Sequence, residues 1–308
     1  MRRVYLLALS GLLALSLAGC ESKQEEAAQK APEQLGPAET VVASAAQMRK
    51  GDLAAVIKGA VPAKRYEEIR SEWSRRVKEE PSSEKDKQEF AEMMGKLTAS
   101  DAETKLYAEL EPELAKMETE MAAQLPLMVG MGRGFAVQAL MESKELNDAQ
   151  KQQATAMIDA LAAWVQSANF FDRDKAKAAI GHVVGTARSL NLQSLDQVEQ
   201  MQFEEAMNKA GEAYLGLSKT LSVYGLDLDA TLASVKAEVV EQKEDLAKVK
   251  VSYSLFNQPL SFETEMVRRD DRWFGKDAMK ELDKALAPKP ADDAAPAEAE
   301  AEAEAGQP

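Results

Sequence analysis

The spacing of apolar side chains changes once along this chain, and the change limits what the chain can fold into. From Thr40 to about Leu226, apolar residues recur every three or four positions, which places them on one face of a helix. The clearest run is Phe203, Met207, Ala210, Tyr214, Leu217, Leu221 and Tyr224. From Val249 onward, apolar and polar residues alternate, which indicates strands with one apolar face. We therefore predict an α+β fold, predominantly α, with a helical body and a small C-terminal antiparallel β-meander.

Capping residues predict where several of the helices begin. Ser100 and Ser194 are each followed three residues later by Glu or Gln, which is the pattern of a capping box. Asn147 and Asp172 fit the N-cap positions of two more helices.

Turn residues divide the alternating region into strands. Asn257–Pro259 separates two strands, and Asp270-Asp271 precedes a third short strand at Arg272–Phe274. The segment Val235–Val240 fits either a preceding strand or the continuation of a helix. Lys276–Leu286 returns to helical spacing, so we expect a closing helix after the strands.

The two ends of the chain differ in composition from its middle. Residues 20–39 are mainly polar at first and show no apolar period, so we expect a flexible tether. Residues 288–308 are mainly Pro, Ala and acidic residues, which bury too little apolar surface to fold, so we expect a disordered acidic tail. Between them we predict a helical domain at 40–226 and a β-meander with its closing helix at 227–287.

The chain contains one cysteine and one histidine, and this scarcity excludes several kinds of chemistry. A structural zinc site, an iron–sulfur cluster, a Cys/His nucleophile pair and an intrachain disulfide all need more of these residues. We therefore expect no metal and no other cofactor. The net charge of −14 argues against nucleic acid as a partner, because the chain would repel phosphate.

The N-terminus has the layout of an export signal. Arg2-Arg3 is followed by an apolar stretch from Val4 to Leu15, which is shorter than the about 20 residues that span a bilayer. The string Leu17-Ala18-Gly19-Cys20 resembles the lipobox of bacterial lipoproteins. The resemblance implies that residues 1–19 are removed as a signal peptide and that Cys20 becomes an acylated N-terminus held in membrane lipid. The alternative is an ordinary secretory signal in which the cysteine is incidental.

The residue after the cysteine bears on the location of such a lipoprotein. In lipoproteins generally, Asp at this position tends to retain the protein at the inner membrane, and Glu21 stands there in this chain. The resemblance therefore implies the periplasmic face of the outer membrane, with the inner membrane as the alternative. The segment Val249–Lys276 also loosely resembles the sheet endings of small NTF2-like lipoproteins.

Three features resemble parts of catalytic sites, and each has a structural interpretation. Asp227-Leu228-Asp229-Ala230-Thr231 matches the D-x-D-x-T string of haloacid-dehalogenase-type phosphotransferases, but no α/β units follow it, so we expect an N-cap. Ser82-Ser83-Glu84-Lys85 fits the S-x-x-K string of penicillin-binding enzymes, but it lacks their partner motifs, so we expect a helix start. His182 is expected on a helix surface or at a contact between helices, with Gly181 and Gly185 allowing the close approach of a neighbour.

Methionine sulfur is a soft ligand that suits Cu(I), and six methionines are candidates for such a site. They are Met93, Met94, Met117, Met121, Met128 and Met131. Because they recur at helical spacing, we expect them to fill the core instead.

Four aromatic residues are the candidates for binding. Trp73 lies among charged residues and is expected to be partly exposed and to contact a partner. Tyr253, Phe262 and Trp273 would line a pocket if the sheet and its covering helix enclose one. We predict a non-enzymatic binding or envelope-assembly module, with an envelope protein as a candidate partner. The alternatives are a carrier or sensor of a small apolar ligand, and a cell-wall enzyme that uses two converging carboxylates alone.

Overall fold

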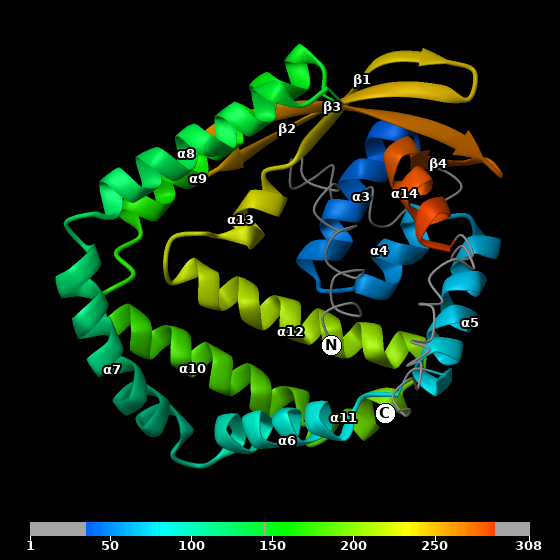
Figure 1. The fold of residues 1–308 in the computed structure, drawn as a ribbon. Helices are drawn as coiled ribbons and strands as arrows, with labels where there is room; N and C mark the ends of the chain where they lie inside the picture. Colours follow the sequence, from blue (N-terminus) through cyan, green and yellow to red (C-terminus); the bar gives the residue numbers. More distant parts are fainter. Residues whose placement is uncertain (1–34, 80, 145, 287–308) are drawn as a thin grey trace, which may run out of the picture.

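A computed structural model describes residues 35–79, 81–144 and 146–286. Helices form most of this part, and a four-stranded antiparallel sheet follows them, which confirms the predicted α+β fold (Figure 1). The helices are α3 (Pro37–Arg49), α4 (Leu53–Ala60), α5 (Ala63–Glu79), α6 (Glu84–Thr98), α7 (Ala102–Met121), α8 (Leu125–Glu142), α9 (Asp148–Ser167), α10 (Arg173–Leu190), α11 (Leu195–Glu199), α12 (Phe203–Ser222), α13 (Leu228–Ala233) and α14 (Lys276–Leu286). The strands are β1 (Lys236–Lys243), β2 (Leu246–Leu255), β3 (Gln258–Arg269) and β4 (Arg272–Gly275). The predicted signal peptide, Cys20, most of the tether and the acidic tail lie outside the described residues.

Side chains cap three of the predicted helix starts. Asn147 Oδ1 accepts a hydrogen bond from Gln150 N at 2.9 Å. Asp172 Oδ1 accepts one from Lys175 N at 3.0 Å. Ser194 Oγ accepts one from Gln197 N at 3.3 Å. These bonds satisfy backbone donors that the first turn of a helix leaves free.

The capping box predicted at Ser100 does not form. Helix α7 begins at Ala102, and Asp101 precedes it without a side-chain cap. Glu103, which would have closed the box, binds Arg188 of α10 instead, with Nη1 and Oε1 2.7 Å apart. A tertiary ion pair has therefore replaced the local contact.

The first described helix begins inside the segment predicted as tether. Leu35 and Pro37 are buried, and Pro37 occupies the start of α3, where the fixed φ of proline suits a helix. Gly36 N donates a hydrogen bond to Glu39 Oε2 at 3.0 Å and so closes the first turn. The fold therefore includes residues 35–39, which the sequence analysis assigned to the tether because the segment shows no apolar period.

The sheet has the strand order β1-β2-β3-β4, with every neighbouring pair antiparallel. The ambiguous segment Val235–Val240 contributes to strand β1, which carries a bulge between Val239 and Glu241. Phe256 and Asn257 both have positive φ and form a two-residue turn, one residue earlier than predicted. Asp270-Asp271 forms the predicted turn before β4.

The main core lies between one face of the sheet and the helices that cover it. Alternate residues of β2 are buried, and Val249 and Val251 are fully so. Val41, Val42 and Ala45 of α3 belong to the same buried cluster. The core therefore crosses the predicted boundary at residue 226, because a helix from the beginning of the body covers the sheet at its end.

Helix α9 is fixed to the hairpin between β2 and β3. The indole of Trp164 stacks on Phe256 with ring centroids 5.4 Å apart, and its Nε1 donates a hydrogen bond to the carbonyl of Tyr224 at 2.7 Å. Ala160, one turn earlier, is fully buried in the core cluster of the sheet. These contacts fix the position of the α8–α9 hairpin relative to the sheet.

Helix α12 approaches its neighbours at two glycines. A Cβ atom on Gly211 would lie 1.8 Å from the carbonyl oxygen of Gly51, in the loop between α3 and α4. A Cβ atom on Gly216 would lie 2.0 Å from Oγ1 of Thr186 on α10. Neither distance is sterically allowed, so both approaches require glycine.

The predicted apolar seam of α12 is only partly buried. Phe203 is buried, but Leu217 is 51% exposed, and the other fully buried positions carry small residues. These are Ala206, Gly211, Gly216 and Ser218. Because α10 and α4 contact α12 from different sides, close approach decides which residues are buried, and the heptad spacing did not predict this.

The remaining helices follow the outside of the molecule. Figure 1 shows α5, α6, α7 and α8 one after another along the rim, with α12 crossing inside them. Helix α10 packs on α12, α7 and α6, and α8 packs along α9. The α8–α9 hairpin and α5 lie at opposite edges of this view (Figure 1).

We predict that Gly216→Ala destabilises the protein by about 1–3 kcal/mol, because the added methyl group overpacks the contact with Thr186. Gly185→Ala on α10 is the matched control, since a Cβ atom there would meet nothing within 4 Å. It should stabilise the protein by about 0.5–1 kcal/mol through helix propensity. Urea unfolding measures both changes. Equal stability of the two variants would contradict the close approach of α10 and α12.

Candidate functional site

Trp73, the predicted contact residue, is half-buried on α5. Its ring packs edge-on against Phe203 of α12, with centroids 6.2 Å apart. Its Nε1 donates a hydrogen bond to the carbonyl of Met201 at 3.3 Å. Trp73 is partly exposed, as expected, but its contacts fasten α5 to the start of α12.

The three residues predicted to line a pocket belong to the packed core. Tyr253 and Trp273 are buried in the cluster beneath the sheet, and Phe262 packs against that cluster. Tyr253 and Phe262 meet edge-to-face with centroids 6.3 Å apart. Burial raises the pKa of the Tyr253 hydroxyl. The structure thus brings the three together but gives no support to a ligand carrier that uses them.

The Asp227–Thr231 string forms a helix start and a tertiary ion pair. Asp227 Oδ1 accepts a hydrogen bond from Ala230 N at 2.8 Å and caps α13, as predicted. Asp229 binds Arg49 at the end of α3, with Oδ1 3.0 Å from Nε. Thr231 Oγ1 donates to the carbonyl of Asp227 at 2.7 Å. Each polar group of the string therefore has a structural partner.

The Ser82–Lys85 string also begins a helix. Ser83 Oγ accepts a hydrogen bond from Asp86 N at 3.2 Å and caps α6. Ser82 N donates to Glu199 Oε1 of α11 at 2.7 Å. Lys85 is 81% exposed and lies 3.7 Å from Glu89 along the same helix. This arrangement is that of a capped helix, in agreement with the prediction.

His182 is exposed on α10, as predicted. The close approach that we expected beside it, at Gly181 and Gly185, does not occur, because a Cβ atom on either glycine would meet nothing within 4 Å. Helix α10 contacts α12 through Thr186, and the glycine at this contact is Gly216 on α12. The small residues of this helix therefore did not predict the contact surface.

Ion pairs and backbone amides account for the shifted carboxyl groups in the described part of the chain. Hydrogen bonds from Arg75 and then Arg76 lower the pKa of Glu72 to about 2. The pKa of Glu103 is lowered by Arg188, and that of Asp172 by the backbone amide of Lys175. A general acid needs a raised pKa instead. These groups give the carboxylate-enzyme alternative no support.

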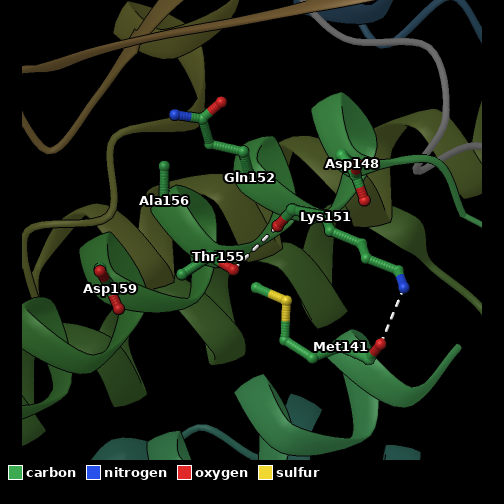
Figure 2. A pocket seen from close by; sticks show the side chains of 7 residues that line it. All are labelled: Met141, Asp148, Lys151, Gln152, Thr155, Ala156 and Asp159. Atoms are coloured by element: carbon green, nitrogen blue, oxygen red, sulfur yellow. Dashed lines mark hydrogen bonds between the residues drawn. The ribbon is translucent and has the colours of Figure 1, made fainter.

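A surface hollow lies between α8 and α9. It has a volume of about 410 Å³ and is lined by Met141, Asp148, Lys151, Gln152, Thr155, Ala156 and Asp159 (Figure 2). Lys151 Nζ donates a hydrogen bond to the carbonyl of Met141 at 2.7 Å. Figure 2 shows the two carboxylates at opposite ends of the lining, and eleven residues of helix separate them by about 16 Å. That separation exceeds the about 5–10 Å of paired catalytic carboxylates.

The second hollow has a volume of about 270 Å³ and lies between α6 and α7. It is lined by Glu89, Glu92, Met93, Lys96, Leu97 and Leu106. Glu92 Oε1 accepts a hydrogen bond from Gln88 on the same helix at 2.8 Å. Within the described residues, no three or more His, Cys, Asp and Glu side chains gather in a way that could hold a metal ion.

The prediction that the methionines fill the core is wrong for most of them. Met94 is buried and Met121 half-buried, but the other four of the set are exposed. These are Met93, Met117, Met128 and Met131. Helical spacing does not distinguish a covered apolar face from an uncovered one, and α8 has no buried residue at all.

Comparison of the chain with protein-family models, with curated proteins and with solved structures gives no match. None of the helices within residues 35–286 combines the length and the apolar character that crossing a membrane requires.

The exposed apolar face of α8 is the feature that sequence reasoning missed. The signal for it is the stretch Leu125–Met141, which is mostly apolar, has Arg133 as its single charged residue and contains three glycines.

We predict that Asp227→Ala destabilises the protein by about 0.5–2 kcal/mol, because α13 loses its N-cap. Asp227→Asn is the matched control, since an amide oxygen can accept the same hydrogen bond. Chemical unfolding of both variants measures the difference. An equal loss in the Asn variant would mean that the negative charge, rather than the cap, is what α13 requires.

Proposed function

We propose that this protein is a lipid-anchored periplasmic protein of the bacterial outer membrane, with a non-enzymatic role in binding or envelope assembly. One observation carries the proposal. The sole cysteine of the chain, Cys20, is the last residue of the Leu17-Ala18-Gly19-Cys20 string, directly after a short apolar segment. The order of a hydrophobic residue, two small residues and a cysteine is complete at this position, which an incidental cysteine would not require.

The arrangement of the fold is compatible with an anchor at this position. The described fold begins at Leu35, fifteen residues after Cys20. Those residues can extend over about 50 Å, so the anchor and the domain need not interfere with one another. Several acyl chains, at about 0.8 kcal/mol for each buried CH₂, hold a domain firmly at a membrane surface.

The use of polar groups supports a binding role over catalysis. The Asp227 and Ser83 side chains cap helices, and the Glu72 and Asp229 carboxylates bind arginines. Several exposed large apolar side chains, among them Leu127, Met131 and Phe135, lie on α8. Exposed apolar surface of this kind is typical of a site that another surface covers.

The anchor can be tested by metabolic labelling with palmitate. We expect label on the wild-type protein and on the neighbouring control Ser22→Ala, and none on Cys20→Ala, because the acyl chains need the Cys20 sulfur. Equal labelling of the Cys20→Ala and wild-type proteins would refute the anchor.

The binding role can be tested by crosslinking in the periplasm followed by affinity purification. We expect one envelope protein in a fixed ratio to this chain, because assembly requires a defined interface. Recovery of the chain without any such partner would contradict the assembly role and would favour a carrier of a small ligand.

A further inference from the structure

Helix α8 presents a continuous apolar face to the outside of the molecule. Leu127 and Phe135 are each 68% exposed, and Met131, one turn from either of them, is 54% exposed. Met128 extends the same surface and is about half exposed. Four large apolar side chains on one face of one helix form more than the scattered exposure that soluble domains ordinarily show.

The opposite side of α8 is held in place by α9. This inner side carries a row of half-buried apolar residues, spaced by four, eight and three positions. They are Leu125, Val129, Val137 and Leu140. Arg133 fills the gap in this row and binds Asp159 of α9, with Nε and Oδ1 2.6 Å apart. The outward direction of the apolar face therefore follows from packing and an ion pair on the inner side.

The charge of α8 differs from that of the chain as a whole. The chain has a net charge of −14, but the stretch from Leu125 to Met141 contains no acidic residue. Its single charged residue is Arg133. The acidic remainder of the chain would repel an anionic lipid surface, but this stretch has no negative charge that would do so.

We propose that the apolar face of α8 inserts into the lipid surface to which the chain is anchored and so fixes the orientation of the domain on the membrane. This inference rests on the proposed anchor at Cys20. The fifteen residues from Cys20 to Leu35 could span at most about 50 Å, which is similar to the diameter of about 46 Å expected for a sphere with the radius of gyration of a domain of this size. A connection of this length does not by itself press one face of the domain against the lipid, and the exposed apolar side chains of α8 would leave water on contact with it.

The geometry of such a contact is that of an interfacial helix. Leu127, Met131 and Phe135 would enter the boundary between headgroups and acyl chains, while α9 stays on the aqueous side. A helix that lies in the interface needs no length to span a bilayer, and α8 is not a membrane-spanning helix. The membrane would thereby hold the domain at two places, the acylated cysteine and this helix.

The test uses the full acylated chain, purified from membranes and placed in vesicles of phosphatidylethanolamine and phosphatidylglycerol. A single cysteine is introduced by Phe135→Cys and labelled with an environment-sensitive maleimide dye. The matched control is Lys85→Cys on α6, an exposed position on a charged helix. The vesicles are prepared with and without bromine on their acyl chains, because bromine quenches only dye that enters the lipid.

We expect the dye at position 135 to shift its emission to shorter wavelength and to lose emission in brominated vesicles, while the dye at position 85 does neither. Leu127→Cys should behave like Phe135→Cys. Because α8 has no buried residue, these substitutions should leave the thermal unfolding midpoint unchanged, and that measurement confirms that each variant is folded.

Three results would overturn the inference. Dye at position 135 that stays in water shows that the face does not meet lipid. A shift without quenching by bromine shows that protein, such as a second copy of this chain, covers the face. Equal quenching at positions 135 and 85 shows that the domain has no preferred orientation.

The failure of the anchor itself has a separate signature. Acylated Cys20 has no free thiol, so the chain without an introduced cysteine should take up no maleimide dye. Dye on that chain would refute the proposed anchor. Absence of dye there, together with any of the three results above, would refute only the membrane contact of α8.

Discussion

The two close approaches of α12 hold the parts of this fold together. Gly211 meets the loop between α3 and α4, and Gly216 meets Thr186 of α10, at distances that no side chain would allow. Because α3 also covers the sheet, α12 joins the helical body to the sheet through a helix from the start of the domain. A side chain at either glycine would push α12 away from the neighbour that it meets there. Dense interiors tolerate such changes poorly.

This arrangement leaves the α8–α9 hairpin at the edge of the molecule. Helix α9 is fastened by Trp164 and Ala160, so α8 receives support on one side only. Its other side exposes large apolar residues in a chain that is otherwise strongly acidic. The proposed acyl anchor and this face complement one another, because an anchored domain takes a fixed orientation on a membrane only if a surface of its own contacts the lipid.

The sequence predicted local features better than contacts. The change from helical to alternating spacing predicted the helical body and the sheet, and the caps at Asn147, Asp172 and Ser194 formed as expected, because these features depend on neighbours in the chain. The exposure of Leu217 beside the buried Gly216 could not be predicted, since periodicity does not show which face a second helix approaches. Pro37 was assigned to a linker although it begins a helix.

The spacing of apolar residues also could not predict whether the candidate binding residues line a pocket. Tyr253 and Trp273 alternate as a sheet core requires, but alternation cannot tell a filled core from a pocket. The proposed anchor requires an acylated Cys20, which mass spectrometry of the N-terminal peptide from the membrane-purified protein measures directly. We expect a peptide that begins at Cys20 and carries the mass of acyl chains on that residue. A peptide that retains Leu17-Ala18-Gly19, or one with an unmodified Cys20, would contradict it.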